Sequence, residues 1–128
     1  MKKKTVEELT NVELDYLSAK ALGYDCFIRT SQSRPYPHVW VKHKGIFSPT
    51  TVAKDMQTIM EHAKINISAP VKDDIYWTAY IKGDTIANPA ERRDILARKR
   101  SFYLQDAIVR CFIAFIYGDS TDVEEHKK

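Results

Sequence analysis

Residues 107–117 are the segment that most constrains this fold, because they are apolar on nearly every side of a helix. Arg110 is the one charged residue among them. Such a helix has no side that suits water, so other elements must enclose it. The segment therefore predicts a core helix that begins near Ser101, ends at Gly118 and lies on a sheet.

Two further helices are expected nearer the N-terminus. Thr10 and Glu13 have the spacing of a capping box, and apolar residues then recur at helical intervals up to Gly23. This pattern predicts a helix over residues 11–22, ended by the glycine. Another helix is expected over residues 50–63, because a Ser-Pro pair precedes it and apolar residues again follow at helical spacing.

Short β-rich runs lie between the helices. Ile46 and Phe47 are expected to continue one of these strands past a bulge at Gly45. The runs predict strands at residues 26–29, 39–43, 65–67 and 75–81.

These elements predict a single globular α+β domain over residues 1–118. Its small, mainly antiparallel sheet is expected to combine the strands of residues 26–47 and 65–81 and to pack against the N-terminal helix and the buried C-terminal helix. A length of 128 residues suits one domain. Residues 119–128 are polar and are expected to form a C-terminal tail.

The composition is that of a soluble globular protein, with 44% hydrophobic and 29% charged residues. The net charge of +3 permits an acidic partner without requiring one. No apolar segment follows the charged N-terminal residues, and the longest near-apolar run is shorter than the ~18 residues that span a bilayer. We therefore expect a cytoplasmic protein without a membrane partner.

The sequence offers no arrangement typical of catalysis or metal binding. His38 and His43 are five residues apart on an expected strand, so their side chains point to opposite faces. Cys26 and Cys111 are expected to be free thiols, with the pKa of Cys111 raised by a buried helix. Adjacent acidic residues lie in cap, turn or tail contexts, where both carboxylates are solvated. We therefore expect no catalytic residues, no metal and no cofactor, and a protein that is not an enzyme.

The sharpest feature is a basic segment at residues 92–100. It is expected to form a short helix from Pro89 to about residue 98, with its charges on one broad face. Phe102 and Tyr103 follow, and basic residues beside aromatic ones suit a nucleic acid. An acidic protein partner, or solvation alone, is also compatible with these charges. The candidate partner-binding residues of this segment are Arg92, Arg93, Arg98, Lys99 and Arg100.

Aromatic residues form a second candidate set. One side of the strand at residues 75–81 is assigned to the core, because it carries Ile75, Trp77 and Ile81 at every second or fourth position. Aromatic residues on the opposite side, and others near the second strand, are expected at the surface. Exposed Tyr, Trp and Arg are the residue types that anchor protein interfaces. The aromatic candidates for partner binding are Tyr36, Trp40, Tyr76 and Tyr80.

Four blocks of the chain have a familiar order. Residues 9–23 read LTNVELDYLSAKALG, residues 47–51 read FSPTT, residues 77–81 read WTAYI, and residues 107–119 begin AIVRCFIA and end in GD. Together they resemble the NinX-like family of phage and prophage proteins, whose corresponding blocks read approximately LTGAELDYWVAKALG, SPSTD, W-x-AYI and AAMRCYVAS-x-x-GD.

The chain also departs from this family pattern. Relatives follow SPSTD with a Trp and a Gly-rich segment, whereas residues 52–57 here favour a helix, and residues 91–100 are basic where relatives have a polar loop. The family is one of uncharacterised function. The resemblance therefore implies a phage or prophage origin and a fold, with no reaction and no catalytic residues to transfer.

We expect a small phage- or prophage-encoded accessory protein that acts without catalysis in the cytoplasm of the bacterial host, by binding a host or phage macromolecule. A protein partner is the first expectation, with the chain as an inhibitor or modulator of a host defence or nucleic-acid-processing protein. The alternative is a module that binds nucleic acid directly through the basic segment. The host-directed role rests on the phage resemblance alone.

Overall fold

The computed structural model describes residues 2–30, 32–33, 35–82, 95–118 and 120–123. Its elements, in chain order, are β1 (Lys2–Thr5), the 3-10 helix η1 (Val6–Glu8), α1 (Asn11–Ala21), β2 (Cys26–Arg29), β3 (His38–Val41), β4 (Gly45–Ile46), α2 (Ala53–Ala63), β5 (Asn66–Ser68), β6 (Trp77–Lys82), β7 (Ile95–Ser101), α3 (Leu104–Tyr117) and β8 (Ser120–Val123).

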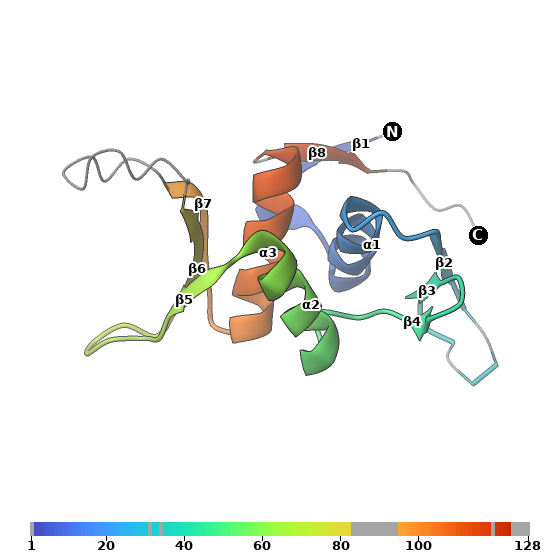
Figure 1. The fold of residues 1–128 in the computed structure, drawn as a ribbon, viewed down its shortest axis with the longest axis horizontal. Helices are drawn as coiled ribbons and strands as arrows, with labels where there is room; N and C mark the ends of the chain where they lie inside the picture. The colour runs from blue at the N-terminus through green and yellow to red at the C-terminus, as the bar shows by residue number, and fades with distance from the viewer. Residues whose placement is uncertain (1, 31, 34, 83–94, 119, 124–128) are drawn as a thin grey trace.

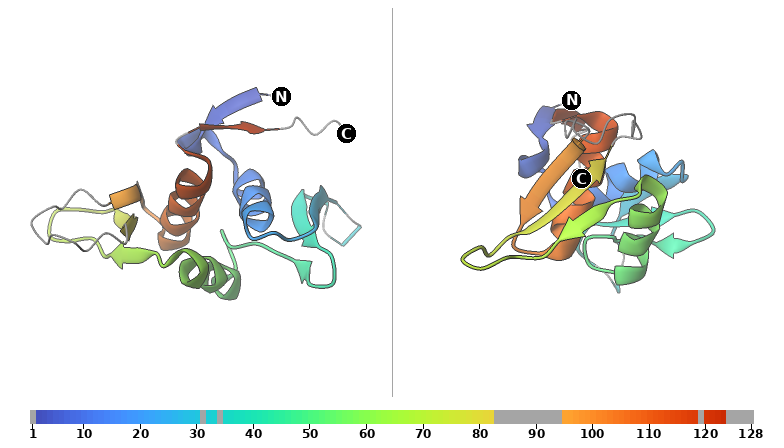
Figure 2. Two further views of the ribbon diagram at one scale, coloured as in Figure 1. Left: turned by 45° about the horizontal axis from the view of Figure 1, so that its top comes forward. Right: turned by 60° about the vertical axis from the view of Figure 1, so that its left-hand side comes forward.

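Helix α3 lies at the centre of the fold (Figure 1). The antiparallel sheet β5–β6–β7 packs on one side of it, α1 packs on the opposite side, and α2 contacts it as well. A second antiparallel sheet, β2–β3–β4, lies beyond α1 (Figure 2). The α+β fold expected from the sequence is confirmed, including a sheet that packs on the C-terminal helix.

The expectation of one combined sheet is wrong. The strands of residues 26–47 and those of residues 65–81 belong to separate three-stranded sheets at the two ends of the molecule (Figure 1). Because α3 has apolar residues on most of its sides, it needs neighbours on opposite sides. Helices α1 and α3 therefore lie between the two sheets, so the strands of one sheet cannot pair with those of the other.

The predictions of the three helices α1, α2 and α3 are confirmed except at two of their ends. Helix α1 has the expected capping box, in which the Thr10 hydroxyl accepts from the Glu13 amide and the Glu13 carboxylate accepts from the Thr10 amide. Helix α2 begins at Ala53 rather than at the Ser48-Pro49 pair. Residues 48–52 instead form a turn, since the Ser48 carbonyl accepts from the amides of Thr51 and Val52. Helix α3 begins at Leu104, three residues later than expected.

Residues 45–47 do not continue the strand before them past a bulge. The chain reverses at residues 42–44, where His43 has a φ of 68°, and β4 returns antiparallel to β3. Phe47 then becomes buried and packs edge-on against Tyr24, with 5.5 Å between ring centroids.

The expected basic helix is also wrong where it can be tested. Residues 95–101 form strand β7, which pairs antiparallel with β6. The alternation of Leu96, Arg98 and Arg100 with Ala97 and Lys99 suits a half-buried strand, whose side chains point alternately to the two faces of the sheet. The beginning of the predicted helix, with Arg92 and Arg93, lies outside the described residues.

Part of the expected C-terminal tail is ordered as a strand. Residues 120–123 form β8, which pairs antiparallel with β1 and brings the two ends of the described chain side by side (Figure 2). None of the described helices is long and apolar enough to cross a membrane.

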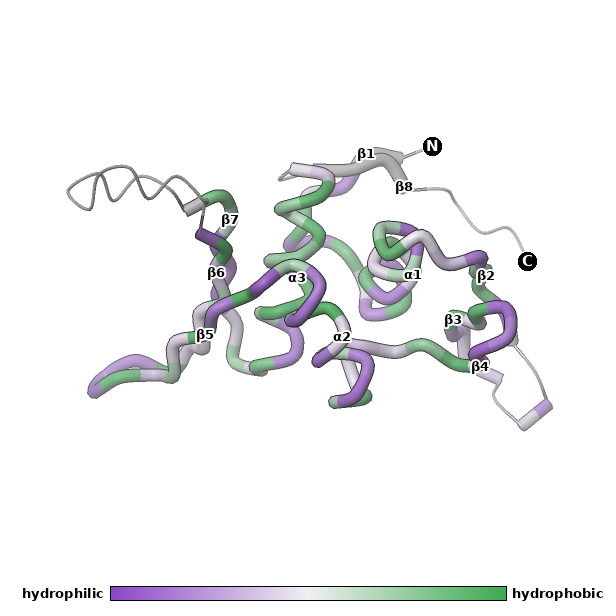
Figure 3. The backbone as a smooth tube through the Cα atoms, viewed as in Figure 1, coloured by the Kyte–Doolittle hydropathy of each residue, from purple (hydrophilic) through white to green (hydrophobic). Residues whose placement is uncertain are grey.

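The core is built around the middle of α3, which carries hydrophobic residues along its length (Figure 3). Cys111 is fully buried, and burial raises the pKa of its thiol to about 12, as expected for an inert structural thiol. Phe115 and Ile116, however, are exposed, because the last turn of α3 extends beyond the sheet toward β1 and β8 (Figure 1). Ile81 is buried as expected, whereas Ile75 is 58% exposed and its assignment to the core is wrong.

The two phenylalanines of α3 give a matched test of this core. Phe112 is fully buried and packs at about a right angle to the ring of His62, so Phe112→Ala should lower the free energy of unfolding by about 3–5 kcal/mol through the cavity it leaves. Phe115→Ala, on the exposed last turn, should cost about 1 kcal/mol. Urea denaturation of both variants measures the difference, and equal losses would contradict the central position of α3.

Candidate binding face

One face of the sheet β5–β6–β7 combines arginine and tyrosine side chains from both candidate sets. Ala79 and Ile81 are buried on the side toward α3, so the residues that alternate with them point away from the helix. Pairing of β6 with β7 places Arg98 directly opposite Tyr80 and Arg100 opposite Thr78. We call this side the outer face; its residues are Asn66, Ser68, Thr78, Tyr80, Lys82, Leu96, Arg98 and Arg100.

Arg100 is already engaged at one end of the outer face. Its guanidinium lies 3.0 Å from an Asp74 carboxylate oxygen and 4.9 Å from the centre of the Tyr76 ring. A hydrogen bond from the Tyr76 amide, assisted by Arg100, holds the pKa of Asp74 below its usual range. Tyr76 in turn contacts Phe102, with 4.8 Å between ring centroids. The result is a compact group in which most of the charge of Arg100 is balanced.

The remaining basic candidates are divided by the strand. Lys99 points to the other face of the sheet, where its ammonium lies 2.6 Å from the Glu7 carboxylate. Arg98 is exposed and has no ion-pair partner among the described residues. The structure therefore does not gather the described part of the basic segment on one side, and Arg98 is the member of that part that leaves a positive charge available on the outer face, beside Lys82.

The other aromatic candidates lie at the far end of the molecule, near β3 (Figure 1). Trp40 is half-buried beneath the Arg29 guanidinium, which lies 3.9 Å from its ring centre. Tyr36 is exposed, and its carbonyl oxygen lies 3.2 Å from Nδ1 of the buried His38. The structure thus brings Tyr76 and Tyr80 together with Arg98 and Arg100, but separates them from Tyr36 and Trp40.

Exposed apolar side chains also occur at the β5–β6–β7 end, on both faces of the sheet and in the segments that flank it. Leu96 lies on the outer face and is 57% exposed, and Phe102 and Tyr103 follow β7 with exposures of 57% and 74%. The exposed apolar residues of this end are Ile67, Val71, Ile75, Leu96, Phe102 and Tyr103.

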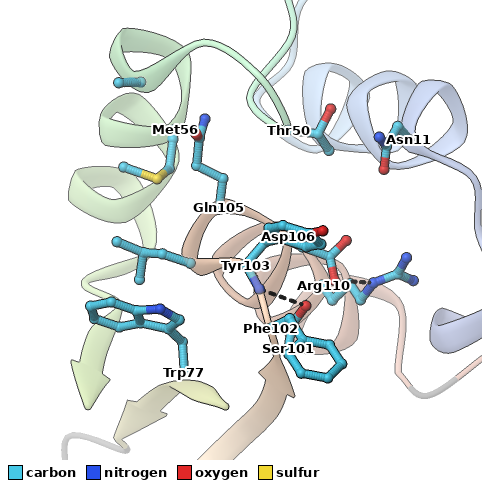
Figure 4. Close-up of a pocket in the computed structure, with 12 residues that line it drawn as sticks. Asn11, Thr50, Met56, Trp77, Ser101, Phe102, Tyr103, Gln105, Asp106 and Arg110 are labelled. Atoms are coloured by element: carbon cyan, nitrogen blue, oxygen red, sulfur yellow. Dashed lines mark hydrogen bonds and ion pairs between the residues drawn. The ribbon is translucent and has the colours of Figure 1, made fainter. Parts of the chain in front are cut away.

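A groove with a volume of about 900 Å³ lies beside this end, between the starts of α2 and α3 (Figure 4). Its polar side chains are largely occupied within the protein. Gln105 donates to the Pro49 carbonyl at 3.1 Å, and Arg110 binds Asp106 at 2.8 Å and the backbone carbonyls of Val6 and Leu9. Apolar side chains, among them Trp77, form much of the remaining wall. The groove therefore offers a ligand mainly a concave apolar surface, with few polar side chains left to react or to bind.

A buried carboxylate beside the groove escaped the sequence analysis. Asp15, on α1, is 6% exposed and accepts hydrogen bonds from the Thr50 amide (3.0 Å), the Thr50 hydroxyl (3.1 Å) and the Ser48 hydroxyl (3.1 Å). The Ser48 amide donates to a second carboxylate, that of Asp55, at 2.9 Å. Burial raises the pKa of Asp15 from 3.8 to about 6 despite these bonds. The signal in the sequence is the position of Asp15 on the side of α1 that also carries the buried residues Leu14 and Ser18.

The described residues contain no group of three or more His, Cys, Asp or Glu side chains that could hold a metal ion. His38 is buried near β2, whereas His43 is exposed in the turn after β3.

The family model described as Bacteriophage P22, NinX matches residues 5–115 of the chain. This match covers most of the chain, so the protein belongs to the NinX family, as the four sequence blocks indicated. The comparison with curated proteins gives no significant match. Two of the family-like blocks meet in the structure, because Asp15 of the first block holds Ser48 and Thr50 of the second.

The raised pKa of Asp15 predicts an unusual pH dependence. Between about pH 4 and pH 6 the folded protein keeps a proton on Asp15 that the unfolded chain releases, so the free energy of unfolding should fall as pH rises through this window. The decrease assigned to this group is about 3 kcal/mol. Asp15→Asn removes the titrating group. The difference in the free energy of unfolding between the variant and the native protein, measured by denaturation across the window, should therefore change with pH. A constant difference would contradict the assignment.

Proposed function

We propose that this phage accessory protein acts without catalysis, by binding a protein partner through the outer face of the sheet β5–β6–β7. The observation that carries the proposal is the position of Arg98 and Tyr80 as direct neighbours on an exposed sheet face, next to the exposed apolar Leu96. Arginine and tyrosine surrounded by apolar area have the composition of residues that anchor protein interfaces.

The charge distribution favours a protein over a nucleic acid. A nucleic-acid site gains most of its affinity from several unpaired cations that lie along the phosphate backbone. Here Lys99 is paired with Glu7 on the opposite face and Arg100 is paired with Asp74. The charge left on the described part of the outer face comes from Arg98 and from Lys82, which lies 5.9 Å from the centre of the Tyr80 ring. Such a surface suits a partner with a few acidic groups and apolar contacts.

Membership of a phage family supports a partner from the bacterial host or from the phage itself. We propose that the partner is a host protein of defence or nucleic-acid processing, met in the host cytoplasm, and that the chain inhibits or modulates it. Direct binding of nucleic acid remains the alternative that the experiment must exclude.

The test is capture of partners from host lysate by the tagged protein and two charge-reversal variants. Arg98→Glu should abolish retention of the partner, because it reverses the free charge of the outer face. Lys42→Glu is the matched control, since Lys42 is exposed at the β2–β3–β4 end and its reversal leaves the outer face unchanged. Mass spectrometry identifies what each protein retains, and circular dichroism checks that both variants fold.

Nuclease treatment and salt separate the two kinds of partner. A protein partner should stay bound after nuclease digestion, and its affinity should respond weakly to salt, whereas phosphate contacts lose affinity steeply as log[salt] rises. Retention that disappears with nuclease would refute the protein-partner proposal. Loss of the partner with Lys42→Glu but not with Arg98→Glu would assign binding to the other end of the molecule.

A further inference from the structure

We propose that strand β7 binds its partner by edge pairing, as the template for an extended, acidic segment of the partner protein. This inference rests on the proposed function and specifies how the partner would attach. The main chain of β7 would supply hydrogen bonds to the added strand, and Arg98 and Arg100 would select its side chains.

Strand β7 is the longer of the two edges of its sheet. It has seven residues and pairs with β6 alone among the described strands, whereas β5 at the opposite edge has three. The right-hand view of Figure 2 shows β7 along the outer border of this sheet. An edge strand presents backbone N–H and C=O groups that another strand can pair with, and a longer edge offers more of them.

The side chains of β7 give this edge a positive charge on its outer face. Arg98 and Arg100 are two residues apart and therefore point to the same face, where Lys82 of the neighbouring strand lies as well. Acidic residues two apart on an added strand would lie opposite both arginines. Arg100 can bind such a residue without releasing Asp74, because a guanidinium has five N–H donors. On the other face the charge of Lys99 is paired with that of Glu7. The side chains of the outer face would therefore decide which strand can be added.

The same charges argue against a second copy of this chain as the occupant. An antiparallel copy of β7 would place arginines of the two strands on the same face and near one another, and like charges in opposed strands are destabilising. Charged side chains on an edge are a common protection against self-pairing. Here they exclude a basic strand and favour an acidic one, so charge complementarity identifies the partner class.

Synthetic peptides as long as β7 test the inference against the complete protein. The probe alternates Glu and Thr, so that all its carboxylates lie on one face of a strand, and a control peptide has the same composition with its Glu residues contiguous. Binding is followed by NMR of the labelled protein. We expect the alternating peptide to bind about tenfold more tightly than the control, and to slow hydrogen exchange at the β7 amides.

Two further variants separate charge from backbone pairing. Arg98→Glu combined with Arg100→Glu should abolish binding of the Glu peptide and permit binding of a Lys-Thr peptide, whereas Lys42→Glu should bind the Glu peptide as the native protein does. A Glu-Thr peptide methylated on all its amide nitrogens should not bind, because neither of its edges keeps the donors that edge pairing requires.

The possible failures point to different conclusions. Equal binding of the methylated peptide, or no protection at β7, would overturn edge pairing and leave the proposed function intact if Arg98→Glu still loses the captured partner. Concentration-dependent self-association through β7 would overturn the argument from like charge. Displacement of the peptide by single-stranded DNA at physiological salt would overturn both proposals in favour of nucleic acid.

Discussion

The arrangement of this protein depends on the burial of helix α3. Its middle residues, Ala107 to Val109 and Cys111 to Ile113, are all completely inaccessible, so the helix needs neighbours on opposite sides at once. The sheet β5–β6–β7 supplies one side, and α1 and α2 supply the others. This demand separates the strands into two sheets. It also leaves the side of β5–β6–β7 that points away from α3 without a covering layer among the described elements, and that side is the outer face proposed here for binding.

A polar contact complements this apolar core. Asp15 joins α1 to the turn at residues 48–52 through three hydrogen bonds, and Asp55 binds the same turn from the first part of α2. Removing a carboxylate from water is costly, and hydrogen bonds from Ser48 and Thr50 offset part of that cost. Because the Ser48 hydroxyl is used by Asp15, it does not cap a helix, and α2 begins later than the Ser-Pro pair suggested.

Most of the local structure could be predicted from the sequence, because it is determined by signals within a few residues. The capping box of Thr10 and Glu13, the alternation before Lys82 and the apolar run of α3 all gave the correct type of element. The errors concern contacts between distant segments. No local pattern indicates that residues 120–123 pair with β1 or that Asp15 contacts residues 48–50.

Strand β7 shows how one such error changes a functional interpretation. On a helix the basic residues would form one broad positive face, as nucleic-acid binding requires. On a strand, consecutive charges point to opposite faces, so Lys99 reaches Glu7 while Arg98 and Arg100 remain on the outer face. The net positive charge of the segment is unchanged, but its division weakens the case for phosphate binding. What remains is an edge strand with two arginines at strand spacing, and the proposed pairing with an acidic strand is based on this geometry.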